Sequence, residues 1–416
     1  MIVFTLIASF MCLAHGSEYK FLDDFIFGVA TASYQVEGAW NISGKGENIW
    51  DRLTHSNPTY IVDKSNGDIA CDTYHNTVKD VQLLKELGVD VYRFSLSWSR
   101  ILPTGYSYKI NPDGLRYYNE LIDELVRNNI KPFVTLYHWD LPQPLQELGG
   151  WTNRLVVDYF LDYADLVFKN FGDRVEYWIT INEPNLICEF GYALGAFAPA
   201  YTQEGIADYL CGHNVLLAHA QAYKLYQSKY KAKQNGKIGI AFQSFWYEPL
   251  NLNEEEDVRA AENSLQMNLG WFTHPIYSKS GDYPPIMKER IKTLSEQDGF
   301  TKSRLPSFTK DEIEDLKDFG KLQDCSRVGY YNSYLTEVLN ATNEDGCNVT
   351  GYLAWSFLDN FEWDQGYTAK FGLYHIDFED PKRTRTPKMS TYVYKNIIKQ
   401  RKINWGYIPD GFTECD

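Results

Sequence analysis

Short apolar runs alternate with longer amphipathic segments along most of the chain. The runs are rich in β-branched and aromatic residues, whereas the segments between them carry apolar side chains at helical spacing. This alternation is typical of βαβ units, in which helices cover a parallel sheet. The pattern predicts six strands, at Phe25–Ser33, Asp90–Trp98, Lys131–Trp139, Glu176–Asn182, Lys237–Tyr247 and Val349–Phe357.

Amphipathic helices are expected between these strands. Val78, Val81, Leu84 and Leu87 are predicted to share one face of a helix that Gly88 ends. Similar spacing recurs in two later segments, with Val156, Phe160, Tyr163, Val167 and Phe171 before Gly172, and with Val215, Ala218, Ala222 and Tyr226 inside Leu210–Tyr230. No linker rich in Ser, Gly or Pro divides the chain, so we expect one domain over residues 17–416.

The spacing between predicted strands changes once. Successive strands start 65, 41, 45 and 61 residues apart, and then 112 residues separate Lys237 from Val349. That interval predicts helices instead, at Glu255–Tyr277, Pro285–Glu296, Lys310–Lys317 and Ser326–Glu344. A β/α barrel closes with eight strands. Since a strand with its crossover helix takes at least ~30 residues, we expect an incomplete (β/α)8 barrel of about six strands that lacks roughly 60 residues or more.

Composition and charge narrow the possible partners. The 416 residues are 44% apolar, which is enough for a large core, and they carry a formal charge of −15. Nucleic acids and anionic membranes bind basic faces, so a neutral or cationic small ligand fits this chain better. Aromatic residues reach 16%, which suits a cleft that stacks on flat ligand faces, although a packed core accounts for most of them.

The first residues of the chain predict secretion. Residues 1–16 hold an apolar stretch followed by small residues, as in a signal peptide, and the stretch is too short for a membrane anchor. Sequons for N-glycosylation at Asn41, Asn340 and Asn348 agree with this interpretation. Without Cys12, six cysteines remain, an even number that favours disulfides whose pairing the sequence does not reveal.

Polar and aromatic side chains follow the predicted strands at their carboxyl ends, where a parallel barrel carries its active site. The strongest motif is an apolar strand that ends in Asn182-Glu183, with Pro184 preventing its continuation. The other strand ends contribute Gln35, Glu37, Arg93, His138, Asp140, Trp355, Glu362 and Trp363. Amide, imidazole and carboxylate groups bind sugar hydroxyls, and indole rings stack on sugar C–H faces. Each residue alone could serve packing or a turn, but together they favour a sugar pocket.

Six ordered motifs resemble those of glycoside hydrolase family 1, the β-glucosidases and their thioglucosidase relatives. They are Tyr34-Gln35-Val36-Glu37-Gly38, Tyr92-Arg93-Phe94-Ser95, Tyr137-His138-Trp139, Asn182-Glu183-Pro184, Ala354-Trp355-Ser356 and Asn360-Phe361-Glu362-Trp363. The resemblance covers nearly the whole mature chain. It implies a (β/α)8 barrel that hydrolyses terminal β-D-glycosyl residues of small glycosides with retention, without a metal or another cofactor.

The resemblance also assigns roles to individual residues. It implies that Glu183 is the general acid/base and that Arg93 lies beside the nucleophile. It further implies that Trp355 forms the floor under the sugar and that Trp363 makes a further glycone contact. The residues that it implies as ligands of glycone hydroxyls are Gln35, His138, Asn182 and Glu362.

The chain departs from the family in the long interval before Val349. There the family places a sixth strand, and a seventh that ends in Thr-Glu-Asn-Gly and supplies the nucleophile. This sequence has neither, because its Glu-Asn pairs, Glu47-Asn48 and Glu262-Asn263, do not follow apolar strands. The sequence up to Lys317 resembles the segment before the sixth strand, and the sequence from Asp318 resembles the segment after the nucleophile. We interpret the join near Lys317/Asp318 as an internal deletion.

A missing nucleophile predicts an impaired enzyme. Retaining hydrolysis uses two carboxyl groups ~5 Å apart, and Glu183 alone cannot form the covalent intermediate. A gene-model or splicing artefact, a genuine skipped-exon transcript and a retained noncatalytic role all remain open as origins of the gap. The alternatives for function are a catalytically inactive, secreted sugar-binding protein and a myrosinase-like thioglucosidase. The lack of H-E-x-x-H, C-x-x-C and G-x-S-x-G motifs disfavours metal and serine-hydrolase chemistry.

Overall fold

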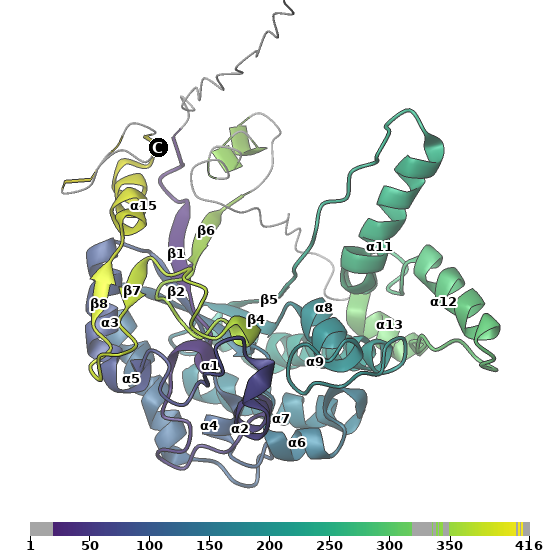
Figure 1. Cartoon of the computed structure of the whole chain (residues 1–416), viewed down its shortest axis with the longest axis horizontal. Coiled ribbons are helices and arrows are strands. Elements are labelled where there is room, and N and C mark those ends of the chain that lie inside the picture. The colour runs from purple at the N-terminus through teal and green to yellow at the C-terminus, as the bar shows by residue number, and fades with distance from the viewer. Residues whose placement is uncertain are drawn as a thin grey trace, which may run out of the picture.

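A six-stranded parallel sheet forms the centre of the molecule (Figure 1). The computed structural model describes residues 20–317 and 349–404, with positions 335, 338–339, 341–343, 407 and 409–410. The strands are β1 (Ile26–Ala30), β2 (Val91–Ser95), β3 (Lys131–Tyr137), β4 (Tyr177–Asn182), β5 (Lys237–Ala241) and β6 (Gly351–Trp355). All six predicted strands are confirmed, and each is shorter than predicted.

The order of the strands is that of a barrel opened at one seam. From β1 to β5 each strand pairs with the next along the chain, and β6 returns to pair with β1, with Ala30 opposite Trp355. Within the described residues, β5 and β6 do not pair with each other. The chain therefore has the α/β architecture of a β/α barrel, and its sheet is open between β5 and β6.

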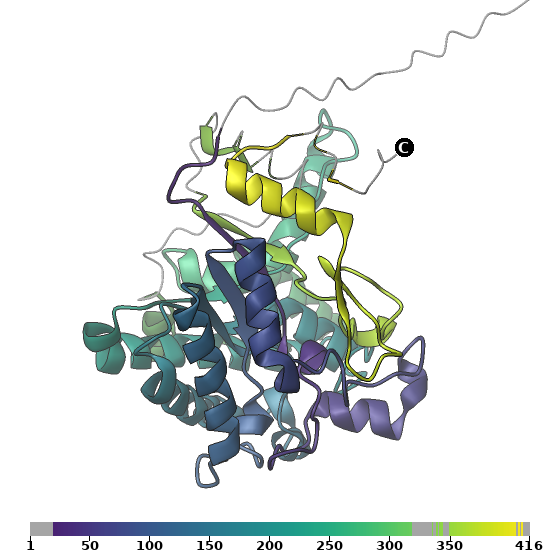
Figure 2. The ribbon, with the colours of Figure 1, turned by 90° about the vertical axis from the view of Figure 1, so that its left-hand side faces the viewer.

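Helices follow the strands and cover the outside of the sheet. The longer ones are α3 (Thr73–Leu87), α5 (Pro112–Arg127), α7 (Leu155–Phe171), α9 (Ala207–Leu225), α11 (Glu255–Tyr277), α12 (Pro285–Gln297) and α15 (Met389–Gln400). Contacts run from α3 to α5, from α5 to α7 and from α7 to α9, so these helices form one continuous layer. Figure 2 looks onto this layer, with α15 in yellow above it and in contact with α3.

Shorter helices and turns complete the described chain. The short α-helices are α1 (Ser33–Val36), α2 (Ile49–Ser56), α4 (Trp98–Ile101), α6 (Gln143–Glu147), α8 (Pro184–Leu186), α10 (Lys231–Gln234) and α13 (Lys310–Lys317). The 3-10 and π segments are η1 (Pro58–Tyr60), η2 (Gly150–Thr152), η3 (Ile187–Ala193), η4 (Tyr226–Tyr230) and η5 (Trp363–Gln365). Two short strands, β7 (Tyr374–Ile376) and β8 (Arg385–Pro387), form an antiparallel pair that the sequence pattern did not predict.

Helix α3, which follows β1 and α2 along the chain, ends at a glycine and buries one apolar face. Gly88 has a φ of +85° and donates its N–H to the carbonyl of Leu84 at 3.1 Å, which is the left-handed ending that glycine favours. Its buried face holds Val81, Leu84 and Leu87, but Val78 is 62% exposed, so its assignment to that face is wrong. Three residues of an α-helix fall about 60° short of a full turn, so side chains three positions apart do not point in the same direction. The three steps of three from Leu87 back to Val78 add up this difference and turn Val78 away from the sheet.

The end of β5 is the largest departure from the predicted strands. The strand stops at Ala241 rather than Tyr247, and Phe245 and Trp246 are 55% and 77% exposed. A strand needs a hydrogen-bonded neighbour, and β5 pairs only with β4 among the described strands. The predicted helix at Ser326–Glu344 lies mostly outside the described residues, although positions 335, 338–339 and 341–343 are helical.

The cysteines divide into a disulfide and a buried thiol. Cys188 and Cys211 form a disulfide that ties η3 to α9. Cys71 is a free, buried cysteine, so the disulfides that the even number of cysteines favours do not include it. Its thiol instead donates to the carbonyl of Asp359 at 2.9 Å, and burial raises its pKa. The remaining cysteines, at positions 12, 325, 347 and 415, lie outside the described residues.

Candidate functional site

The predicted site residues gather at the carboxyl end of the sheet. Gln35 lies in α1 just after β1, Arg93 is in β2, and His138 follows β3. Asn182 ends β4 and Glu183 follows it, Trp355 ends β6, and Glu362 and Trp363 lie in the loop beyond β6. Hydrogen bonds, stacked rings and electrostatic coupling connect these side chains, so the structure brings the predicted set together.

Asn182 is the centre of a hydrogen-bond network. The buried guanidinium of Arg93 donates to Asn182 Oδ1 and also to Thr135 Oγ1, the latter at 3.0 Å. The Asn182 amide nitrogen donates to Glu183 Oε2 at 2.8 Å and lies 3.1 Å from His138 Nε2. With its oxygen held by Arg93, the amide must turn its N–H groups toward Glu183 and His138. Asn182 therefore fixes the orientation of the Glu183 carboxylate.

Glu183 has an unusual backbone conformation for a residue with a side chain. Its φ is +45°, in the left-handed region, which costs a non-glycine residue about 1–2 kcal/mol. Its N–H donates to the carbonyl of Ala241 at 2.8 Å, and Pro184 begins α8 directly after it. Backbone strain of this kind occurs preferentially at functional sites. The strand-to-helix turn thus holds the half-buried Glu183 at the rim of the sheet.

A second carboxyl group, that of Glu362, is coupled electrostatically to Glu183. Burial raises its pKa to about 7, and the negative charge of Glu183 adds to the rise. Hydrogen bonds from Gln35 and Trp355 to this carboxylate act in the opposite direction. Gln35 is fully buried and donates to Asn360 Oδ1 at 3.1 Å and to the carbonyl of Phe361 at 3.0 Å. These contacts join the loop after β6 to α1.

Aromatic rings form one wall of the site around Trp363. Its indole stacks on Tyr34, with ring centroids 6.3 Å apart at 7°, and on His138, at 5.9 Å and 23°. Trp50 and Trp139 each approach it to 4.8 Å, and Trp50 and Phe197 are ring neighbours that the sequence analysis missed. Both are aromatic residues outside the strand-end motifs, so only tertiary packing places them here.

Trp355 and His138 form a second stacked pair. Their ring centroids lie 6.0 Å apart at an interplanar angle of 22°. Since Trp355 also hydrogen-bonds Glu362, the same indole offers a polar edge to Glu362 and an apolar face to His138. Such a surface suits a ligand that combines hydroxyl groups with flat C–H faces.

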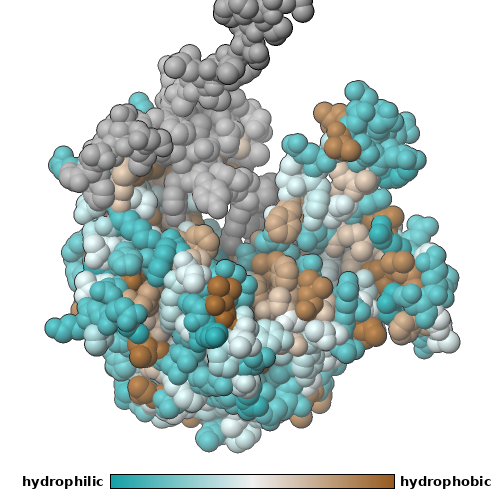
Figure 3. All heavy atoms as spheres, in the orientation of Figure 1, coloured by the Kyte–Doolittle hydropathy of each residue, from teal (hydrophilic) through white to brown (hydrophobic). Residues whose placement is uncertain are grey.

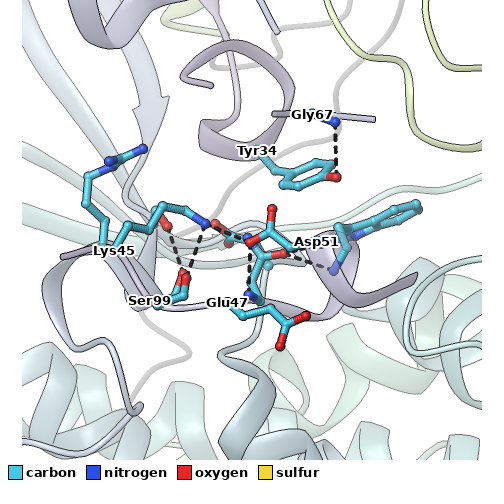
Figure 4. Close-up of polar contacts among 12 residues, drawn as sticks. Tyr34, Lys45, Glu47, Asp51, Gly67 and Ser99 are labelled. Carbon is cyan, nitrogen blue, oxygen red and sulfur yellow. Dashed lines mark hydrogen bonds and ion pairs between the residues drawn. The ribbon is translucent and has the colours of Figure 1, made fainter. Parts of the chain in front are cut away.

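Buried ion pairs and hydrogen bonds hold the segments next to the site in place. The Glu37 carboxylate accepts from Arg100 at 2.9 Å and from the Tyr118 hydroxyl at 2.6 Å. Lys45 and Asp51 form a second buried ion pair at 2.7 Å, visible in Figure 4. Tyr34, which stacks on Trp363, accepts a hydrogen bond from the N–H of Gly67. These contacts fix the segments on either side of α1, the helix that carries Tyr34 and Gln35.

Asp140 links the two strand ends that carry Gln35 and His138. Its Oδ2 accepts from the Ser33 hydroxyl at 2.8 Å, and the Ser95 hydroxyl donates to Ser33 in turn. Burial raises the pKa of Asp140 to about 8, so the carboxyl group is largely protonated at neutral pH. The chain of hydroxyl groups thus couples the position of α1 to the end of β3.

The Glu-Asn pairs singled out in the sequence lie elsewhere. Glu47 binds Arg52 at the start of α2, and Glu262 lies within α11. Asn41 is exposed, whereas Asn340 and Asn348 lie outside the described residues. Across the described ranges, no cluster of three or more His, Cys, Asp or Glu side chains could hold a metal ion. A search of the same ranges finds no helix long and apolar enough to cross a membrane.

Known proteins share this architecture over most of the chain. The chain is 42% identical to Myrosinase 1 of Brevicoryne brassicae over 465 aligned positions, which cover 92% of this chain and 100% of that protein. It is 39% identical to Beta-glucosidase 42 of Arabidopsis thaliana, over 93% of this chain and 96% of that one. A rice β-glucosidase mutant, solved in a covalent complex with Glc, superposes with a TM-score of 0.82 at 35% identity, covering 90% of this chain and 98% of that one.

The family model for these enzymes matches in two pieces. The model described as glycosyl hydrolase family 1 matches residues 17–321 and again residues 310–403. The two pieces together span most of the chain and include the strand ends of the site. The resemblance inferred from six motifs is thereby confirmed at the level of the family. On this match and on the similarity to the named relatives, the chain belongs to glycosyl hydrolase family 1, the β-glucosidase and myrosinase type of glycoside hydrolase.

Proposed function

We propose that this chain binds the terminal glycosyl residue of small β-glycosides but does not complete retaining hydrolysis by itself. The observation that carries the proposal is Glu183, half-buried at the rim and hydrogen-bonded by Asn182, in a pocket whose other carboxyl group belongs to Glu362. Asn182 holds Glu183 in a defined orientation, as a group that protonates a leaving oxygen requires.

The remaining residues fit a hydroxyl-binding role. Gln35, His138, Asn182 and Glu362 present amide, imidazole and carboxyl groups to one pocket. Trp355 and Trp363 supply indole faces next to them. We assign the first group to the glycone hydroxyls and the two indoles to the sugar's C–H face. Arg93 acts through Asn182, whose amide it orients.

Glu362 does not suit the role of nucleophile. A nucleophilic carboxylate must be ionised and free to attack, but burial raises the pKa of Glu362 to about 7. Its carboxylate is also hydrogen-bonded by Gln35 and Trp355. The rice relative was solved in a covalent complex with Glc, and covalent retaining chemistry needs a second carboxylate about 5–5.5 Å from the acid. In the described residues, the carboxyl group coupled to Glu183 is that of Glu362, which these hydrogen bonds hold in place.

Turnover measurements on the purified chain test this proposal. We expect binding of an aryl β-glucoside without release of the aryl group above the uncatalysed rate. Turnover that Glu183→Gln abolishes would contradict the proposal. Glu362→Gln is the matched control. Loss of that turnover in both variants identifies Glu362 as the replacement nucleophile only if Glu362→Gln still binds the aryl β-glucoside, because Glu362 is also assigned to a glycone hydroxyl.

A thioglucosidase is the second candidate, favoured by the 42% identity to Myrosinase 1. O-glycosides and thioglycosides differ at the leaving atom, whereas the glycone pocket serves both. Competition between an aryl β-glucoside and its thio analogue for binding to this chain would rank the two classes. A preference for the thio analogue of tenfold or more supports the thioglucosidase, and equal binding favours the ordinary β-glucosidase.

We also propose that the chain is secreted as a single domain over residues 17–416, after loss of residues 1–16. The Cys188–Cys211 disulfide and the exposed sequon at Asn41 support it, since both chemistries belong to the secretory pathway. Expression in insect or mammalian cells should release a protein that begins at Ser17. Retention of the chain inside the cell with residues 1–16 attached would contradict the proposal.

A further inference from the structure

Glu362 and Trp363, two of the proposed glycone contacts, follow a loop that has little regular structure. Residues 356–361 lie between β6 and η5, in neither a helix nor one of the named strands. All of them are nevertheless buried, with exposed fractions of 1% or less. Buried backbone that lacks the hydrogen bonds of a helix or sheet must find other partners. The positions of Glu362 and Trp363 therefore depend on what holds residues 356–361.

Asp359 is the charged residue of this buried loop. Its Oδ1 accepts the N–H of Gly372 at 2.9 Å and the ammonium group of Lys388 at 2.6 Å, and its Oδ2 lies 3.0 Å from Nδ1 of His375. The Asp359 side chain is fully buried, whereas those of His375 and Lys388 are 49% and 28% exposed. A buried carboxylate is stable only when such partners replace water. These contacts thus hold Asp359 in one place.

The partners of Asp359 belong to the elements that follow the loop. Gly372 precedes β7, His375 lies in β7, and Lys388 is the N-cap residue of α15. The N–H of Asp359 adds a backbone hydrogen bond to the carbonyl of Tyr374 at 2.9 Å. Figure 3 shows mainly hydrophilic residues on the surface over β7 and β8. The loop is therefore anchored to a solvated pair of strands and to the start of α15.

The residues after Asp359 are tied to α1. Asn360 Oδ1 accepts a hydrogen bond from Gln35 Nε2 at 3.1 Å, and the N–H of Phe361 donates to the carbonyl of Gln35, also at 3.1 Å. Asp359 thus fixes the start of this short segment, and Gln35 fixes its end. A shift at Asp359 moves the backbone that leads directly into Glu362.

A second buried carboxylate, that of Asp80, holds the same pair of strands from another part of the chain. It accepts hydrogen bonds from Arg385 in β8, at 2.7 Å from Nε and 2.9 Å from Nη2. Asp80 lies in α3, which carries no residue assigned to the sugar. Both carboxylates form buried ion pairs, but only Asp359 lies in the segment that leads into Glu362. Loss of the Asp80 pair therefore reports the effect of destabilisation alone.

We propose that Asp359 is a positioning residue for glycone binding, which holds the segment 359–361 against β7 and α15 and thereby places Glu362 and Trp363 at the sugar. Side chains that bind a ligand must be held to within about 0.5 Å of their working positions. Lys388 contributes the positive charge that makes burial of the Asp359 carboxylate favourable. That Glu362 and Trp363 bind the glycone rests on the proposed function; the anchoring of their segment does not.

Four substitutions test the role of Asp359. Asp359→Asn keeps the shape of the side chain but removes its charge. Lys388→Met removes the ammonium partner, whereas Lys388→Arg keeps a cation there. Asp80→Asn is the matched control for loss of a buried ion pair. At a temperature at which circular dichroism shows each variant folded, isothermal titration with methyl β-glucoside measures glycone binding. Hydrogen exchange of a peptide over residues 360–366 measures the anchoring without any ligand.

The variants should separate positioning from stability. We expect Asp359→Asn to weaken binding of methyl β-glucoside by about tenfold or more, and to speed exchange of residues 360–366 by a similar factor, because the segment loses its anchor. Lys388→Met should change both readouts in the same direction, and Lys388→Arg should restore most of the affinity. Asp80→Asn should change neither readout by more than about twofold, because it is not part of the segment.

Equal effects of Asp359→Asn and Asp80→Asn on both readouts would show that Asp359 serves stability alone, and would overturn the proposal. Faster exchange without weaker binding would overturn it too. If Asp359→Asn does not fold, Lys388→Met and Lys388→Arg decide by the same criteria. Absence of binding by the unmodified chain would overturn the proposed function, and the exchange comparison then decides whether Asp359 anchors the segment.

Discussion

The two sides of the sheet differ in how completely their side chains are buried and paired within the described residues. On the side of β1 to β4, large side chains such as Trp98, Trp151 and Trp178 are fully buried, and charged groups are paired. On the side of β5, Trp246 is 77% exposed, and no residue of α11 before Gly270 is buried. In the part of the chain that the structure describes, neighbouring strands and helices complete one side, whereas β5 on the other side pairs only with β4. Glu183, the proposed acid, directly follows β4.

Removing a buried charge should separate the two sides most strongly. Arg100→Met leaves the Glu37 carboxylate buried without its ion-pair partner, which costs about 3–5 kcal/mol. The matched control on the open side is Arg259→Met, since Arg259 and Glu256 are exposed and 3.9 Å apart, and it should cost less than about 0.5 kcal/mol. Urea unfolding measures both. Equal losses would mean that the completed side is no better packed than the open one.

Two tryptophans test packing in the same way. Trp363 is 6% exposed and has four aromatic neighbours, so Trp363→Ala should cost about 3 kcal/mol through the cavity that it creates. Trp246→Ala removes a side chain that is largely in water and should change stability by less than about 0.5 kcal/mol. A large loss for Trp246→Ala in the monomer would show that segment 242–254 is already covered.

The buried carboxyl group of Asp140 makes the completed side sensitive to pH. Because its pKa is raised to about 8, its contribution to stability is fully present below pH ~4 and is lost as the pH rises through 8. Asp140→Asn keeps the shape but does not ionise. Between pH 6 and pH 9 the unmodified chain should lose at least about 1 kcal/mol more than this variant. If denaturant unfolding gives the same pH dependence of stability for the unmodified chain and for Asp140→Asn, Asp140 is not the cause of that dependence.

The sequence predicted the positions of the strands better than the residues at which they end. Apolar periodicity located all six strands, and the strand-end motifs located His138, Asn182 and Glu183, which share one hydrogen-bond network. It did not predict that β5 ends at Ala241, because the length of a strand depends on a neighbour that local sequence does not describe.

Long-range contacts were equally hidden. Trp50 reaches Trp363 across more than 300 residues of chain, and Cys71 is paired with a carbonyl rather than a sulfur. The coupling of Asp140 to Ser33 also joins residues far apart in sequence. Periodicity and motif spacing carry no information on such contacts, since only the packed fold creates them.

Intact-protein mass spectrometry tests the central claim most directly. The claim is that the site holds its acid, Glu183, but no carboxylate placed to attack the sugar. After the purified chain is mixed with an aryl β-glucoside that has a very good leaving group, its mass should remain that of the unmodified polypeptide. A mass gain of one glucosyl group, in the unmodified chain or in Glu183→Gln, where loss of the base for the second step would make the adduct accumulate, would contradict the account.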